Sequence, residues 1–163
     1  NTKRQLQSGA DAKVVALEEA TRRTQNMGIL AGTLPAQGPG VKITLYDPKD
    51  KITPEILLNA IEELRDAGAE VIELNESVRL VASSWIGVAD DALVVSGQKV
   101  SRPIVIKAIG DPATLAEAAR FRGGLISTVE SEQVGGRVTL KQEENLQITS
   151  LHDPIPMRYA RPA

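Results

Sequence analysis

Residues 41–75 have the sequence VKITLYDPKDKITPEILLNAIEELRDAGAEVIELN, which holds a strand on either side of a helix. Apolar and polar residues alternate over 41–47, a pattern typical of a half-buried strand. Residues 70–75 follow a glycine and are rich in apolar side chains, so they form the next strand. The segment therefore predicts a β-α-β unit whose two strands run parallel.

Three consecutive residues mark the start of the intervening helix. Thr53 supplies a hydroxyl N-cap, Pro54 fits the first helical position, and Glu55 places an acid in the first turn. The apolar residues that follow share one face, and Gly68 provides a C-terminal stop. We expect a helix over 54–67.

The rest of the domain alternates strands and helices in the same way. Asp111-Pro112 repeats the combination of a cap and a proline, and Gly123-Gly124 ends the second helix. The further elements that we expect are strands at 78–86 and 92–95, a turn at 96–99, a buried strand at 104–109, a helix at 112–122, and strands at 138–140 and 146–148 around a polar turn at 142–145. This order predicts an α+β fold, a ferredoxin-like β-α-β-β-α-β sandwich with an inserted hairpin.

A long N-terminal helix precedes this domain. Residues 1–34 carry a weak seam at spacings of four and three, made of Leu6, Ala10, Val14, Leu17, Thr21 and Thr24. A helix from about residue 3 to residue 32 would be ~45 Å long, too long to pack along its whole length on one small domain. We expect a projecting stalk or coiled-coil partner helix, with a frayed chain end as the alternative.

Proline and glycine mark the boundaries of the domain. Gly32, Pro35 and Gly38-Pro39-Gly40 interrupt regular structure between the helix and the first strand. The chain therefore divides into an N-terminal helix or stalk (1–34), a ferredoxin-like domain (35–150) and a proline-rich C-terminal tail (151–163).

Composition excludes several classes of function. The 163 residues carry a net charge of −2 and only 2% aromatic residues, so we expect no nucleic-acid partner. Without cysteine and with a single histidine, thiolate chemistry and histidine-rich metal sites are excluded. No run of apolar residues is long enough to cross a bilayer, and because the sequence begins with Asn1, we expect any membrane or targeting segment to lie outside it.

Individual motifs give weak indications of chemistry. Gly38-Pro39-Gly40 precedes a strand, whereas a phosphate-binding loop follows one. Asp90-Asp91 could hold a hard cation with Glu130 or Glu132, but paired acids in a hairpin are more often turn formers. His152 lies near prolines without the local signature of a hydrolase. We expect no catalytic residue, no metal and no cofactor.

The segment from Asn75 to Arg79 is the strongest candidate for a binding site. An asparagine that closes a strand, followed by an arginine in the next strand, can hold a turn through bonds to the backbone. Asn75, Glu76 and Arg79 would also form a compact polar pocket. Structural use is favoured, and ligand binding remains the alternative.

Four blocks of sequence resemble one bacterial family, the domain-of-unknown-function 881 family, in order and spacing. The blocks are GTLPAQGPGVKITLYDP (32–48), NAIEELRDAGAEVIELN (59–75), Val78-Arg79 and PIVIKAIGDP (103–112). The resemblance covers roughly residues 25–150. Its motif positions are Asn75, Arg79, Gly68, Gly110, Asp111 and the adjoining Pro112, and this chain has Glu76 where the family commonly has glycine.

The resemblance also implies a location and a function, which composition alone does not predict. Members typically have one membrane span, a coiled coil and this domain outside the membrane, and several are encoded near cell-division and wall-synthesis genes. We therefore expect a non-catalytic, extracytoplasmic scaffold at the cell membrane, anchored by a segment outside this chain. Its expected partners are a second copy, through the N-terminal helix or the sheet, and envelope or division proteins.

Two other classes of function stay open. Ferredoxin-like sheets often pair and bind small molecules between protomers, so the alternative is a ligand-binding regulatory domain. An enzyme that uses Asp or Glu as acid and base is the least favoured, and it would require a buried carboxylate with a raised pKa near Asn75.

Overall fold

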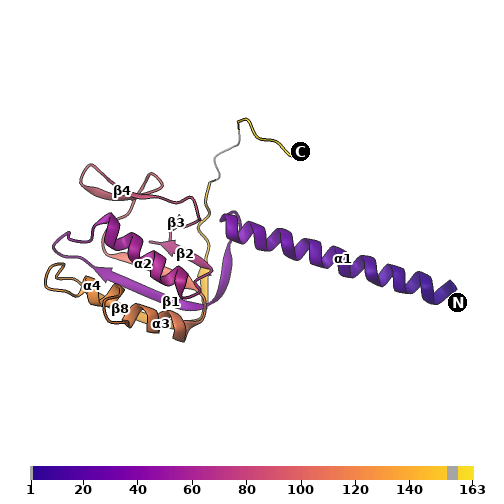
Figure 1. Ribbon diagram of the computed structural model, residues 1–163, viewed down its shortest axis with the longest axis horizontal. Coiled ribbons are helices and arrows are strands. Elements are labelled where there is room, and N and C mark those ends of the chain that lie inside the picture. The colour runs from indigo at the N-terminus through magenta and orange to yellow at the C-terminus, as the bar shows by residue number, and fades with distance from the viewer. Residues whose placement is uncertain (1, 154–157) are drawn as a thin grey trace.

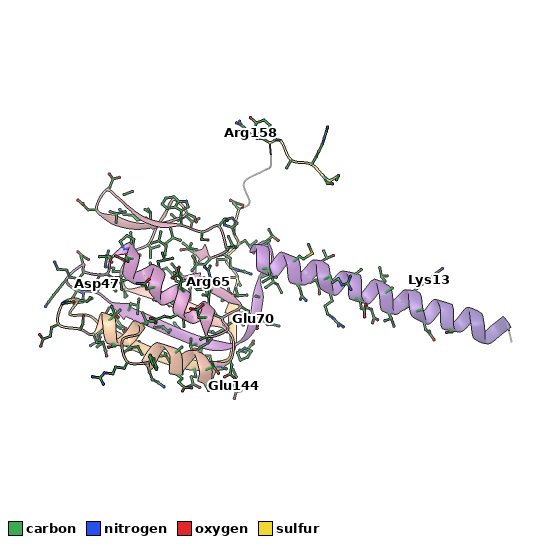
Figure 2. All side chains as sticks on the ribbon, in the orientation of Figure 1. Lys13, Asp47, Arg65, Glu70, Glu144 and Arg158 are labelled. Atoms are coloured by element: carbon green, nitrogen blue, oxygen red, sulfur yellow. The ribbon has the colours of Figure 1, made fainter. Side chains whose placement is uncertain are left out.

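A computed structural model describes residues 2–153 and 158–163, with the backbone alone for residues 2–7. Helix α1 (Thr2–Ala31) extends away from an α+β domain (Figure 1). Its side chains, Lys13 among them, point into solvent along most of its length (Figure 2). Within the described residues, no helix is both long and apolar enough to cross a membrane. The expected long helix is therefore present, and it is continuous through Gly9.

A five-stranded sheet forms the centre of the domain. Its strands lie in the order β3-β2-β7-β1-β8, and all neighbours are antiparallel. The strands are β1 (Ala36–Tyr46), β2 (Val71–Leu74), β3 (Val78–Arg79), β7 (Ile104–Ile109) and β8 (Arg137–Ile148). The order β8-β1-β7-β2 is that of a ferredoxin-like sheet, which confirms the predicted fold class. β1 and β2 run in the same direction, as predicted, but β7 lies between them.

Three helices cover one face of this sheet. They are α2 (Pro54–Asp66), α3 (Pro112–Arg120) and the short α4 (Leu125–Val129), which the sequence did not predict. Thr53 accepts a hydrogen bond from the Ile56 amide at 3.2 Å, and Asp111 accepts one from the Thr114 amide at 3.0 Å, so both predicted caps are present. The core between sheet and helices is aliphatic, and each fully buried Leu or Ile contributes roughly 1.5–3 kcal/mol.

The insertion between β3 and β7 differs from the expected strand at 78–86. β3 ends at Arg79, and the chain turns near Ser84, whose hydroxyl accepts a hydrogen bond from the Val81 amide at 2.8 Å. A separate three-stranded sheet follows, formed by β4 (Ile86–Ala89), β5 (Ala92–Val95) and β6 (Gln98–Lys99). The expected turn at 96–99 is thus confined to Ser96-Gly97, and Asp90-Asp91 form the exposed tip of a hairpin.

The predicted turn at 142–145 is wrong. β8 is one continuous strand that pairs with β1 along its length, and polar residues stand there because β8 is an edge strand. The register shifts between Gly38, opposite Leu146, and Gly40, opposite Glu143, so β8 carries an extra residue in a bulge.

The glycines predicted to precede the first strand lie within it, because β1 begins at Ala36. An added Cβ at Gly40 would lie 1.9 Å from the Ala108 carbonyl oxygen, so the close approach of β1 to β7 requires glycine there. At the other end of the chain, the expected tail includes residues 154–157, which lie outside the described residues.

Candidate functional site

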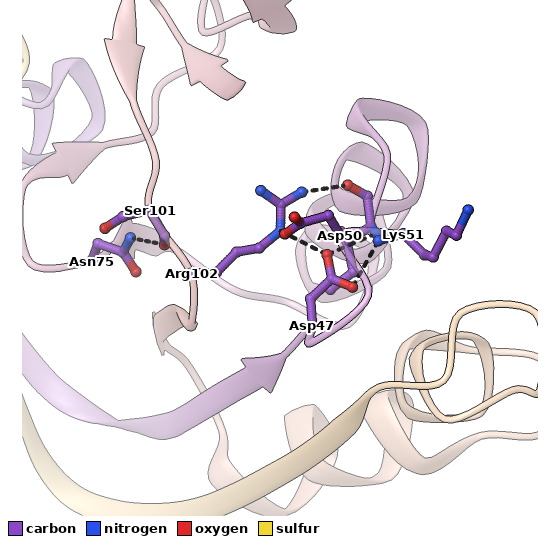
Figure 3. A network of polar contacts seen from close by, with 7 residues as sticks. Asp47, Asp50, Lys51, Asn75, Ser101 and Arg102 are labelled. Atoms are coloured by element: carbon purple, nitrogen blue, oxygen red, sulfur yellow. Dashed lines mark hydrogen bonds and ion pairs between the residues drawn. The ribbon is translucent and has the colours of Figure 1, made fainter. Parts of the chain in front are cut away.

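Asn75 closes β2 with a left-handed backbone, at φ 51°. Its side-chain amide donates to the Ser101 carbonyl at 2.8 Å (Figure 3), and its Oδ1 accepts from the Val105 amide at 2.7 Å. Both ends of the side chain therefore hold the end of β2 against the start of β7. This is the structural role that the sequence favoured.

Glu76 follows with the same left-handed backbone, at φ 57°, and its carboxylate lies 3.0 Å from the Lys107 ammonium. The hydrogen bond and charge of Lys107, together with the charge of Lys42, lower the pKa of Glu76 from its usual value. Glu76 thus contacts Lys107 on the sheet, not Asn75 or Arg79.

Arg79 is buried at the edge of the sheet, with 3% of its surface exposed. Its Nη1 donates to the Ser150 carbonyl at 3.1 Å, and its Nη2 donates to the Ile29 carbonyl at 2.9 Å. Glu73, 1% exposed, lies opposite Arg79 in the β2–β3 pairing and accepts hydrogen bonds from the amide and hydroxyl of Ser150. The polar pocket expected from Asn75, Glu76 and Arg79 is therefore not formed.

We call Arg79, Glu73, Ser150, Gly32 and His152 the stalk clamp. Gly32 has φ +78°, and a Cβ there would lie 2.8 Å from both the His152 Cβ and a methyl of Val81. The His152 amide donates to the Gly32 carbonyl at 2.7 Å. The clamp therefore joins the end of α1, the edge of the sheet and the segment after β8.

The buried charge of Arg79 is offset by hydrogen bonds to two carbonyl groups and by the nearby Glu73 carboxylate. Burial lowers the pKa of Arg79 from its usual value, and the nearby Glu73 carboxylate acts in the opposite direction. An isolated buried charge costs several kcal/mol, so each partner of Arg79 is needed by the others. An apolar cluster of Val71, Ile109, Leu146 and Ile148 packs against Ile29 and extends the contact between α1 and the sheet.

A second polar network surrounds Asp47, where β1 ends (Figure 3). The Asp47 carboxylate accepts hydrogen bonds from the amides of Lys51 at 2.8 Å and Ile52 at 2.9 Å, and from Arg102 Nε at 2.7 Å. Arg102 also lies 3.3 Å from Asp50. Burial alone would raise the pKa of Asp47, but these hydrogen bonds and the Arg102 charge together lower it. The sequence marked Asp47 only as a strand end, because Arg102 is distant in the chain.

Of the remaining predicted motif positions, Gly110, Asp111 and Pro112 lie at the turn between β7 and α3, and Gly68 lies beside this turn, at the end of α2. Gly68 has φ +95° and ends α2, and a Cβ at Gly110 would lie 3.1 Å from its carbonyl oxygen. Asp111 caps α3, and Pro112 is the first residue of that helix. These four residues therefore shape the backbone rather than a ligand site.

The described side chains also define a hollow of about 600 Å³ between α2 and α3, lined by Glu63, Glu117, Phe121 and Arg122 among others. Burial raises the pKa of Glu63, whose carboxylate accepts from the Leu125 amide at 3.0 Å. Glu63 thus caps α4. Among the described residues, no three His, Cys, Asp or Glu side chains are grouped to hold a metal ion, and this includes Asp90-Asp91.

Comparison with known proteins gives consistent matches. The model of a family described as "Bacterial protein of unknown function (DUF881)" matches residues 23–161. UPF0749 protein Rv1825 of Mycobacterium tuberculosis and UPF0749 protein Mb1856 of Mycobacterium bovis are each 39% identical over 165 residues, which cover 99% of this chain and 56% of each relative. The chain therefore spans about half the length of these relatives.

A solved structure also resembles the chain. A crystal structure of an uncharacterized conserved protein from Mycobacterium tuberculosis has a TM-score of 0.78 and 39% sequence identity. The match covers 86% of this chain and 99% of that one. It supports the α+β fold with its long N-terminal helix.

Replacing Arg79 tests the stalk clamp. Arg79→Met leaves the buried Glu73 carboxylate without the nearby guanidinium charge, so we expect a loss of about 3–5 kcal/mol in the free energy of unfolding. Urea denaturation measures this change. The double variant Arg79→Met, Glu73→Met removes both charges and should recover much of the loss. Equal destabilisation of the single and double variants would contradict a charge-paired clamp.

The Asp47 network predicts a dependence of stability on pH. Because the folded pKa of Asp47 is lowered, its stabilisation is complete above the unfolded pKa of about 3.9 and is lost as pH falls through the folded pKa. Thermal unfolding of the native chain and of Asp47→Asn between neutral and acid pH should give curves that converge at low pH. Asp11→Asn removes an exposed carboxylate on α1 as a control. A constant difference between the native and Asp47→Asn curves would contradict this account.

Proposed function

The chain belongs to the bacterial DUF881 family, and from this premise we propose that it is a non-catalytic scaffold domain of the cell envelope. In this proposal a single membrane span anchors the protein, and the domain lies outside the cytoplasmic membrane. Its stalk associates with the stalk of a second copy, and the assembly holds envelope or division proteins. The observation that carries the proposal is the exposure of every side chain of α1 from Ser8 to Met27.

α1 buries very little of its own surface. Over 30 residues it is ~45 Å long, and the side chains from Ser8 to Met27 are all exposed. Val14 and Leu17 are 55% and 69% exposed and lie on the seam identified in the sequence. Helices in water gain most of their stability from packing an apolar face, so α1 is stabilised when another helix covers this seam.

The polar part of the seam is compatible with such packing. The Thr21 hydroxyl donates to the Leu17 carbonyl at 2.9 Å, and the Thr24 hydroxyl donates to the Ala20 carbonyl at 3.0 Å. Both donors are satisfied within the helix, so covering them leaves no unpaired hydroxyl hydrogen. Small residues at Ala10, Thr21 and Thr24 would also let two helices approach closely.

The stalk clamp would transmit association of the stalks to the domains. Its hydrogen bonds from Arg79 reach the last turn of α1 and the segment after β8. Two paired stalks would thus hold two domains at a defined separation. A scaffold needs this property, whereas a flexible tether would only raise local concentration.

The alternative of a ligand-binding regulatory domain at Asn75 and Arg79 lacks this kind of support. Both side chains make hydrogen bonds within the fold, and Arg79 is buried. We therefore do not propose a ligand for them.

Charge placed on the seam should separate the stalks. We expect the 163-residue chain to dimerise, and Val14→Glu with Leu17→Glu to weaken the dimer at least about tenfold, because two carboxylates would replace apolar contact. The matched control, Ala12→Glu with Ala16→Glu, adds the same charge on the opposite side of α1. Sedimentation equilibrium measures both. A monomeric native chain, or equal weakening by the two pairs, would contradict the proposal.

The cellular part of the proposal has its own test. A fluorescent fusion of the full-length protein should concentrate at the septum or growth zone, and protease added to spheroplasts should cleave the domain. A cytoplasmic protein with the same fluorophore provides the control for intact membranes. A diffuse signal protected from protease would overturn the extracytoplasmic location.

A further inference from the structure

One row of charged residues crosses all five strands of the main sheet. The pairings place Arg79 opposite Glu73, Glu73 opposite Lys107, Lys107 opposite Lys42, and Lys42 opposite Lys141. Directly paired residues project from the same face of a sheet. Helices α2, α3 and α4 pack on the other face, where the core residues Ile43 and Leu45 lie. The whole row therefore lies on the face opposite α2, α3 and α4, where only the last turn of α1 packs, beside the Arg79 end of the row.

The two ends of this row have opposite characters. Arg79 and Glu73 are buried in the stalk clamp, where they lie opposite each other on neighbouring strands. At the other end, three lysines occupy adjacent strands whose axes lie about 4.8 Å apart. Like charges directly opposite each other destabilise a sheet. The three neighbouring lysines therefore lower the stability of the sheet in which they lie.

Nearby carboxylates compensate these lysines only in part. Glu76 lies 3.0 Å from Lys107, and Glu143 lies 3.9 Å from Lys141. Lys42, in the middle, makes no ion pair within the part of the chain that the structure describes. The Lys141 side chain is 78% exposed, whereas that of Lys107 is 16% exposed, so the lysine row faces solvent at its β8 end.

The basic character continues along β1 and β8. Thr44 lies opposite Thr139 two residues from the lysine row, and Tyr46 lies opposite Arg137 two residues further. The Arg137 guanidinium stacks 4.6 Å from the centre of the Tyr46 ring, beside a hollow of about 460 Å³. We call Lys107, Lys42, Lys141 and Arg137 the cationic stripe, and its two ends are separated by ~13 Å along the strands. The stripe contrasts with the net charge of −2 for the whole chain.

We propose that the cationic stripe binds a linear polymer, other than a nucleic acid, that carries phosphate groups along its length. Lysine ammonium groups bind phosphate as point charges, whereas planar recognition of carboxylates favours the forked arginine side chain. Arg79 and Arg102 are engaged by internal partners, and Arg137 stacks on Tyr46. The hydroxyls of Thr44 and Thr139 lie between the cations and can donate to phosphate oxygens. A ladder of cations on a sheet face fits an extended chain better than a small molecule.

This inference names a partner class for the proposed scaffold, and it rests on a different part of the molecule from the stalk. The binding probe is linear inorganic polyphosphate, measured by titration calorimetry with the 163-residue chain. Lys42→Gln with Lys141→Gln should weaken binding about tenfold or more and reduce the dependence of affinity on salt. The matched control, Lys51→Gln with Lys99→Gln, removes two exposed lysines elsewhere and should bind like the native chain.

Several results would overturn the proposal. They are the absence of polyphosphate binding, equal losses in the two lysine pairs, and equal binding of poly-L-glutamate of matched charge, which would indicate an acidic protein partner. Repeating the titration with Val14→Glu and Leu17→Glu separates the two proposals. Binding that persists in this background supports the stripe whether or not the stalks associate.

A stability measurement separates a binding role from a structural one. Lys42→Thr removes the central like charge and introduces a residue that favours strands, so it should raise the thermal midpoint of the free protein. The same variant should reduce the rise in midpoint that polyphosphate produces in the native chain. A lower midpoint for free Lys42→Thr would show that the lysine is structural, and it would overturn the proposal.

Discussion

The buried guanidinium of Arg79, held by two backbone carbonyls beside the Glu73 carboxylate, is the group on which the arrangement of this protein depends. A guanidinium inside a protein is stable only when its donors and charge are satisfied together. Arg79 meets this requirement with the Ile29 carbonyl, the Ser150 carbonyl and the adjacent Glu73 carboxylate. Because those partners come from α1, from the end of the chain after β8 and from β2, none of the three segments can leave without exposing an unpaired charge. A strand of only two residues thereby fixes the stalk to the domain.

The row of charged residues that crosses the sheet has a structural end and an end that we propose binds a ligand. Its buried end, in the stalk clamp, contributes to the fold, and its exposed end carries lysines that the fold tolerates at a cost. Residues that oppose stability yet occupy regular strand positions are most easily explained by binding. The clamp residues of β2 and β3 and the cationic stripe on β7, β1 and β8 belong to one hydrogen-bonded sheet, so a ligand on the stripe and a partner on the stalk would act on one unit.

Local sequence signals predicted the fold where the determining contacts are themselves local. Thr53-Pro54 and Asp111-Pro112 cap their helices as expected, and apolar periodicity placed the ferredoxin-like strands in the correct order. The polar residues near Glu144 indicated a turn because local composition does not distinguish a turn from an exposed edge strand. The bulge there depends on pairing with β1, about a hundred residues earlier.

The candidate site was harder to predict because its contacts are distant in sequence. Asn75, Glu76 and Arg79 are neighbours in the chain, but their side chains reach β7, Lys107 and α1 respectively. The row formed by Lys107, Lys42 and Lys141 requires the register of three strands, which periodicity cannot supply. The signal that the sequence did give was an asparagine closing one strand and an arginine in the next, and it located Asn75 and Arg79 without their partners.

The central claim is that the stalk clamp holds α1 and the domain as one rigid unit. The chain lacks cysteine, so Ala16→Cys on α1 and Glu117→Cys on α3 provide two unique sites for spin labels. Pulsed electron resonance, with labelled protein diluted in unlabelled protein, measures the distance between them. We predict a single narrow distance distribution that broadens when Arg79→Met is added. A broad distribution in the protein that retains Arg79 would contradict the claim.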